Sequence, residues 1–229
     1  MYKYKFVFVS ALICITLVCC CFLYKPQSAT SPAYYQKTVL IDAGHGYPDG
    51  GATGVNGTVE SDINLDIACE LKALLEKSGF NVLLTRYDKN TPIEDTKDKK
   101  IRQIKREDLL YRRNMLNSGD ADLFISIHQN KFTDGKYYGA QVFYPLGSDQ
   151  SKRLGSVLQR SLADVLDNGN ERVEKETSEI FILKNATIPS ALVECGFLSN
   201  EEEEKLLNTK KYRKKIAWAI FCGIINYIN

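Results

Sequence analysis

The 229-residue sequence contains only two histidines, and none of its seven cysteines belongs to a CxxC pair. Four cysteines lie in an apolar run near the N-terminus, so the rest of the chain keeps Cys69, Cys195 and Cys222. An odd number without CxxC spacing argues against a disulfide framework and favours apolar, buried roles. The sequence also has no HExxH or HxxE run, so a metal site would have to combine residues distant along the chain.

Outside its N-terminal segment, the chain carries nearly equal numbers of basic and acidic residues. Residues 1–33 hold three lysines and no acidic residue, which leaves 27 basic and 28 acidic residues in 34–229, a net charge of −1. A near-neutral domain has no electrostatic footprint for nucleic acid, so we expect no such partner. The whole chain is 44% hydrophobic and 25% charged, which suits one globular domain at 34–229.

The N-terminal apolar run spans residues 6–24 without a charge, with two lysines before it and one after it. A run of about 20 apolar residues can cross a bilayer as a helix, and basic residues before such a helix favour export of the chain beyond it. No small-x-small cleavage site lies close to the end of the run, and Ser31-Pro32-Ala33 is late. We predict that 1–33 form a retained membrane signal anchor and linker, with cleavage as the alternative, and that 34–229 lie at the extracytoplasmic face.

Short apolar runs, which are typical of strands, alternate through the domain with segments whose apolar residues have helical spacing. Ser61 is the expected N-cap of the first long helix and Gly79 its end. The charge-dense 88–108 segment is predicted to be a solvated loop, partly helical near its end, with docking of a regulatory protein as the alternative. The alternation of expected strands and helices predicts a single three-layer α/β domain with a mostly parallel or mixed sheet of about six strands flanked by helices. The expected strands are 37–42, 81–85, 122–127, 140–144, 179–183 and 190–195, and the other helices are 109–117, 151–166 and 210–227.

Both histidines directly follow or end predicted strands. His45 follows the first strand, and His128 ends the most apolar one. In open α/β sheets, ligands gather at the carboxyl ends of parallel strands, so the two side chains are expected in one site. Either histidine alone would more often be structural.

Two glutamates are candidates to join them. Glu60 lies at the start of the first long helix, where the helix dipole alone would favour an acidic residue. Glu194 lies in an apolar run, where an unpaired carboxylate is unusual, although a salt bridge to Arg86 would also explain it. Two histidines plus a carboxylate match an open catalytic zinc site in which water occupies a remaining position.

Seven stretches of the sequence carry a family resemblance. They are Ile41-Asp-Ala-Gly-His-Gly46, Asp49-Gly-Gly-Ala-Thr-Gly54, Glu60 followed by Asn64-Leu65, Thr85-Arg86, Arg112 with Asn117, Ala121-Asp-Leu-Phe-Ile-Ser-Ile-His-Gln-Asn130, and Pro189-Ser-Ala-Leu-Val-Glu-Cys-Gly-Phe-Leu-Ser-Asn200. In this order they resemble the zinc-dependent N-acetylmuramoyl-L-alanine amidases over nearly the whole domain, 39–227. A single catalytic domain behind one membrane segment is most similar to the sporulation- and germination-specific (CwlD-type) members.

The resemblance implies roles for individual residues. His45, Glu60 and His128 match the family's zinc ligands, and Glu194 matches its catalytic glutamate. The implied reaction is hydrolysis of the amide between the lactyl group of N-acetylmuramic acid and L-alanine in peptidoglycan. In the sporulation members, this reaction precedes muramic-δ-lactam formation in spore cortex.

Other implications concern the surroundings of the metal. Asn130 and Arg86 are candidates for gripping substrate, although Arg86 could be purely structural, and Asp42 is a candidate partner for a ligand histidine. Gln129 and Tyr47-Pro48 depart from the alanine and glycine that are common in the family. Because three protein ligands leave a metal site open, zinc binding could depend on an accessory regulatory protein.

Two alternatives remain open at the level of sequence. In a thiol hydrolase, Cys195 would be the nucleophile and His128 its base. Cys195 is adjacent to Glu194 on a strand, however, so the two side chains point to opposite faces and only one can face the site. The other alternative is a catalytically inactive peptidoglycan-binding domain, which would not require a general base.

Overall fold

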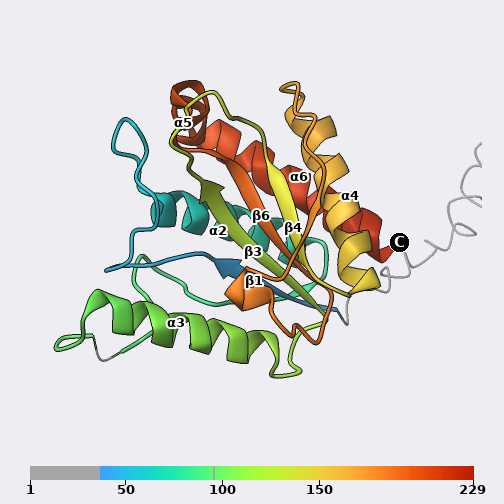
Figure 1. The fold of residues 1–229 in the computed structure, drawn as a ribbon. Helices are drawn as coiled ribbons and strands as arrows, with labels where there is room; N and C mark the ends of the chain where they lie inside the picture. Colours follow the sequence, from blue (N-terminus) through green and yellow to red (C-terminus); the bar gives the residue numbers. More distant parts are fainter. Residues whose placement is uncertain (1–36, 95) are drawn as a thin grey trace, which may run out of the picture. The chain divides into compact units, whose positions relative to one another are not determined.

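The computed structural model describes residues 37–94 and 96–229 (Figure 1). The predicted membrane segment therefore lies outside the described residues. None of the described helices is both long and apolar enough to cross a membrane.

The described residues form one mixed sheet of six strands in the order β2-β1-β3-β6-β4-β5. β1, β2, β3 and β6 run parallel, β4 is antiparallel to β6, and β5 is parallel to β4. This arrangement confirms the predicted fold class. The strands are β1 Thr38–Ala43, β2 Asn81–Leu84, β3 Leu123–Asn130, β4 Gln141–Pro145, β5 Lys175–Thr177 and β6 Ser190–Phe197.

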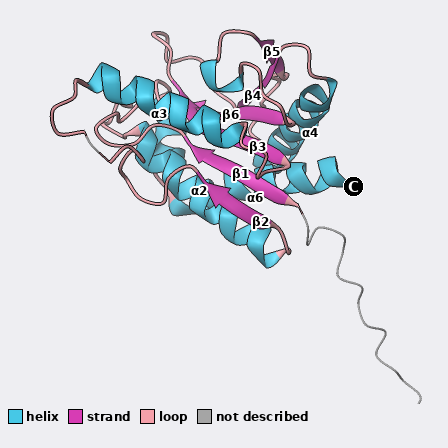
Figure 2. Cartoon of the chain, turned by 90° about the horizontal axis from the view of Figure 1, so that it is seen from below, coloured by secondary structure: helices cyan, strands magenta, loops and turns pink. Residues whose placement is uncertain are grey.

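Helices cover both faces of the sheet (Figure 2). Alternate residues of β1, β3 and β6, such as Ile41, Ile125 and Val193, join a large core with α2, α4 and α6. The intervening residues, such as Phe124 and Leu192, form a smaller core on the α3 side. This alternation is the period of two that a strand buried on both faces requires. The helices are α2 Glu60–Lys77, α3 Ile101–Leu116, α4 Asp149–Leu166, α5 Glu201–Leu207 and α6 Lys210–Ile228.

Two local predictions were wrong. The 179–183 run is not a strand, because Phe181–Leu183 forms a 3₁₀ turn whose Ile182 and Leu183 are buried in the smaller core. Ser61 is not the N-cap of α2, which begins at Glu60. The first amide groups of α2 donate instead to the glycine-rich loop, residues 44–57. The Glu60 amide donates to the Ala52 carbonyl at 2.9 Å, and the Ser61 amide donates to the Gly50 carbonyl at 3.1 Å.

Helix α3 starts at Ile101, inside the charge-dense segment whose end was predicted to be helical. Its Arg112 is only 2% exposed and enters the interior beneath the end of β1. The guanidinium pairs with Asp42 and with Asp108, and it donates to the Ala43 carbonyl at 2.7 Å. Burial disfavours both charges, yet their mutual attraction lowers the pKa of Asp42 and raises that of Arg112.

We expect Arg112→Met to lower the free energy of unfolding by about 3–5 kcal/mol, because it leaves buried carboxylates without their partner. The control is Lys37→Met, which removes the exposed pair between Lys37 and Asp122 and should cost at most about 1 kcal/mol. Urea unfolding followed by circular dichroism measures both. Equal losses in the two variants would contradict this account of Arg112.

Candidate metal centre

His45 occupies a turn immediately after β1. Its backbone has a φ of 61°, a left-handed conformation that few residues other than glycine adopt. Arg112 fixes this turn by donating to the His45 carbonyl at 2.6 Å. The Nδ1 atom of His45 lies 2.8 Å from Asp49 Oδ2, so the Nε2 atom is directed toward the interior of the site. Burial opposes a charged imidazole, but hydrogen bonds to Asp49 and Glu60 outweigh it and raise the pKa of His45 to about 9.

Glu60 is the first residue of α2, and its carboxylate is the centre of the cluster. Its Oε2 accepts a hydrogen bond from the Ala52 amide at 2.7 Å, and its Oε1 accepts one from the Gln129 amide at 3.1 Å. The positive end of the helix dipole also favours a negative charge here. Although burial opposes the charge, hydrogen bonds to His128 and His45 keep the pKa of Glu60 far below its usual range.

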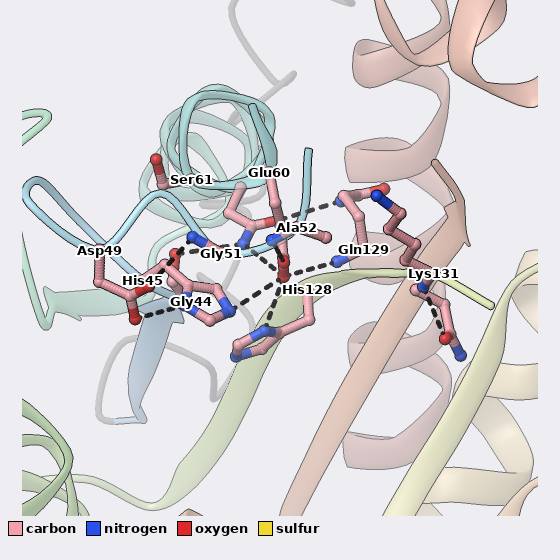
Figure 3. A network of polar contacts seen from close by, with 12 residues as sticks. Gly44, His45, Asp49, Gly51, Ala52, Glu60, Ser61, His128, Gln129 and Lys131 are labelled. Atoms are coloured by element: carbon pink, nitrogen blue, oxygen red, sulfur yellow. Dashed lines mark hydrogen bonds and ion pairs between the residues drawn. The ribbon is translucent and has the colours of Figure 1, made fainter. Parts of the chain in front are cut away.

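His128 lies on β3 and is the third member of the cluster with His45 and Glu60 (Figure 3). Its Nδ1 lies 2.9 Å from Glu60 Oε1, and His45 Nε2 lies 3.3 Å from the same oxygen. One ligand atom from each of the three residues lies within 4.8 Å of the others. Two imidazole nitrogens and a carboxylate oxygen, supplied by three separate elements, therefore converge as a group that can hold a metal ion.

Two glycines make this convergence possible. A Cβ on Gly44 would lie 2.3 Å from the His128 ring, and one on Gly51 would lie 2.5 Å from Glu60 Oε2 and 2.6 Å from the His45 ring. All of these distances are too short for a real carbon contact. The glycine-rich loop thus lets backbone pack directly against the three side chains.

Glu194 stands beside the cluster on β6. It is the register partner of His128 across the parallel β3–β6 pair, so both side chains lie on the same face of the sheet. Its Oε2 atom is enclosed and has no hydrogen-bond partner among the described residues. Burial, reinforced by the nearby Glu60 charge, raises the pKa of Glu194 to about 7 against the opposing effect of the histidines.

Arg86 is buried, and its guanidinium is occupied by backbone carbonyls. It donates to Ala43, Gly44, Asp88 and Ser61 at 2.7–3.2 Å. No salt bridge joins Arg86 to Glu194 within the described residues. The four hydrogen bonds to backbone carbonyls favour a structural role for Arg86 over a role in gripping substrate. The Asn130 side-chain oxygen accepts the Lys131 amide at 2.8 Å, so its carbonyl end is engaged locally.

Asp42 does not hydrogen-bond to either histidine. Its carboxylate accepts hydrogen bonds from Thr85, Ser126 and Arg112 beneath the site. Outside the three-residue cluster, the side chain that contacts His45 is that of Asp49, a role that sequence reasoning missed. Its position four residues after His45, within the glycine-rich loop, was the available signal.

Cys195 is fully buried in the large core, on the opposite face of β6 from Glu194. Burial raises the pKa of its thiol far above its usual range, so a thiolate does not form near neutral pH. The prediction of a Cys195/His128 thiol hydrolase is therefore wrong, because Cys195 does not face His128.

Comparison with known proteins agrees with this geometry. Residues 39–226 match the family model described as N-acetylmuramoyl-L-alanine amidase. The germination-specific N-acetylmuramoyl-L-alanine amidase of Bacillus subtilis is 35% identical over 213 residues, which cover 90% of this chain and 89% of that protein. The amidase AmiA of Escherichia coli is 30% identical, with 90% and 80% covered.

Solved structures give the same result. The CwlD amidase from Clostridioides difficile, in complex with the GerS lipoprotein, superposes with a TM-score of 0.82 at 46% identity and covers 84% of this chain and 98% of that one. The amidase AmiC2 of Nostoc punctiforme gives 0.70 at 27% identity, with 84% and 97% covered. The chain therefore belongs to the N-acetylmuramoyl-L-alanine amidase family, the hydrolases that act on peptidoglycan.

Proposed function

We propose that this amidase is zinc-dependent and cuts the bond between the lactyl group of N-acetylmuramic acid and L-alanine. The observation that carries the proposal is the convergence of His45, Glu60 and His128 beside the unpaired carboxylate oxygen of Glu194. Two imidazoles and one carboxylate are a common ligand set of catalytic zinc sites, which keep a further position open. An inactive binding domain would not require a general base at Glu194.

In this scheme, zinc would activate the reactants, and residues around its three ligands hold those ligands in place. Bound zinc would polarise the amide carbonyl and make a water molecule acidic enough to attack it. Asp49 holds the His45 ring so that Nε2 faces the metal position, as partners of ligand histidines commonly do. The Ala52 and Gln129 amides hold the two oxygens of Glu60, which fixes the third ligand before metal arrives.

Glu194 is the proposed proton carrier. Its unpaired oxygen would take a proton from the attacking water and then give it to the nitrogen of the departing L-alanine. A carboxyl group whose pKa lies near 7 can both accept and return a proton at neutral pH. The amide bond breaks in the second step, and the lactyl carboxylate and the free peptide are the products.

We expect Glu194→Gln to reduce kcat by about 10²–10⁴-fold, because the amide that replaces the carboxylate cannot take the proton. Zinc content and the unfolding midpoint should remain those of the parent chain. Release of peptide from purified peptidoglycan, identified by mass, measures the reaction. The matched control is Glu179→Gln, at an exposed glutamate, which should keep full activity. Full activity of Glu194→Gln would remove this residue from the mechanism.

Metal removal gives a second test. We expect a chelator to abolish hydrolysis and added zinc to restore it, whereas iodoacetamide should leave the activity intact because Cys195 is inaccessible. Exposed Cys69 should be alkylated in the same sample, which shows by mass that the reagent worked. Activity that resists the chelator but not iodoacetamide would refute the zinc proposal.

The biological setting is proposed from the relatives. A germination-specific amidase and the CwlD amidase are among them, which supports a role in spore cortex maturation through muramic-δ-lactam formation. The CwlD structure contains a lipoprotein, which supports an accessory protein for this chain also. Peptidoglycan lies outside the cytoplasmic membrane, in agreement with the predicted signal anchor at 1–33.

We expect the chain to restore muramic-δ-lactam to the cortex of Bacillus subtilis spores that lack their germination-specific amidase. Digestion of the cortex followed by mass spectrometry measures the lactam. The Glu194→Gln variant, expressed at the same level, is the negative control. Hydrolysis of peptidoglycan in vitro without lactam in the spores would separate the enzyme activity from the cortex role.

A further inference from the structure

A cleft of about 500 Å³ lies next to the loop that carries His45. Three tyrosines line it, namely Tyr47, Tyr87 and Tyr111, which are 71%, 69% and 39% exposed. None of these rings contributes to the metal centre. Large aromatic rings left open to water around a concave surface are characteristic of ligand sites, because a ring offers an apolar face and a tyrosine adds a polar tip.

The cleft is held in a fixed position relative to the metal centre. Tyr47 lies two residues after His45, and its backbone amide donates to the Lys89 carbonyl at 2.8 Å while its carbonyl accepts the Thr91 amide at 2.9 Å. Tyr111, another lining residue, precedes Arg112, whose guanidinium donates to the His45 carbonyl. A ligand lying across these rings would therefore meet a preformed surface that is anchored to the turn carrying His45.

The charges in the cleft decide what kind of ligand fits. Asp88 and Glu94 line it, and the one cation among its described lining residues, Arg86, already donates to four backbone carbonyls. The cleft thus offers negative charge but no free cation among the described residues that line it. Peptidoglycan stem peptides carry more carboxylates than free amines, so such a cleft would on balance repel them. The sugar rings of the glycan strand carry no charge where the lactyl group is held in its amide.

The remaining lining groups also suit a sugar. Asn90, Thr91 and Thr96 place polar groups among the tyrosines. The apolar face of a sugar ring can pack on a tyrosine ring, and its hydroxyl and acetamido groups can exchange hydrogen bonds with amide and hydroxyl side chains. We propose that this tyrosine cleft binds N-acetylated sugar rings of the glycan strand adjacent to the muramic acid whose amide is cut. The inference rests on the proposed amidase function and adds a subsite to it.

The test compares two substrates that differ only in glycan length. One is a single N-acetylmuramic acid bearing its stem peptide, and the other is a tetrasaccharide bearing the same peptide. In Tyr47→Ala and in Tyr87→Ala, we expect the preference for the long substrate, measured as the ratio of the two kcat/KM values, to fall about tenfold. Tyr47→Phe keeps the ring and should retain the preference within about twofold, which assigns the effect to the aromatic ring. A tenfold change corresponds to about 1.4 kcal/mol.

Tyr138→Ala is the matched control, because Tyr138 is 46% exposed but lines a different cleft. It should leave the preference unchanged. A second readout needs no hydrolysis: chitotetraose, an uncharged tetramer of N-acetylglucosamine, is titrated into the protein and followed by NMR. We expect Tyr47→Ala to weaken its binding about tenfold, and Tyr47→Phe and Tyr138→Ala to preserve it.

The proposal is overturned if both tyrosine-to-alanine variants keep the preference, or if they lose activity equally on the two substrates. Failure of the parent chain to cleave either substrate would count against the proposed function, whereas chitotetraose binding would still report on the cleft. The two ideas can therefore fail separately.

Discussion

The buried guanidinium of Arg112 is the constraint on which the architecture of this amidase depends. A cation in the interior is tolerated only when its charge and its donors are matched by partners, and here the partners come from α3, from the end of β1 and from the turn at His45. The helix cannot move from the sheet without exposing unpaired charges. The same contacts hold the carbonyl of His45, a member of the candidate metal centre, so global stability and local site geometry have a shared origin.

Strand β6 contributes side chains both to the hydrophobic core and to the candidate site. Glu194 and Cys195 are neighbours, and strand alternation sends their side chains to opposite faces. The thiol is surrounded by apolar groups from the large core and stays protonated, whereas the carboxylate faces the histidines. Position on the strand, and not intrinsic reactivity, decides which of the two can take part in hydrolysis.

Sequence reasoning located the four central residues by combining topology with the family resemblance. His45, His128 and Glu194 lie near the carboxyl ends of parallel strands, which brings them to one edge of the sheet. Glu60, at the start of a helix, has a structural explanation of its own, and the resemblance singled it out. Sequence reasoning failed where the outcome depended on contacts between loops. The cap of α2 is made by carbonyls of the glycine-rich loop, which no residue pattern announces.

Several side-chain contacts and one element also could not be predicted from the sequence. The choice of Asp49 over Asp42 as the partner of His45 depends on the left-handed conformation of His45 itself. The hydrogen bonds of Arg86 to backbone carbonyls depend on the packing of three segments, namely 43–44, the start of α2 and the loop 86–88. The apolar 179–183 run was mistaken for a strand because burial in a 3₁₀ turn requires the same residue types.

The pairing of β3 with β6 has a consequence for how such enzymes can diversify. His128 and Glu194 face each other across one rung of the ladder, so their separation is set by the spacing of adjacent strands, about 4.8 Å between backbones. That spacing is a property of peptide geometry and is insensitive to the length or composition of the surrounding loops. Insertions around the rim can thus change the surface that meets a substrate, while the distance between the His128 and Glu194 backbones stays constant.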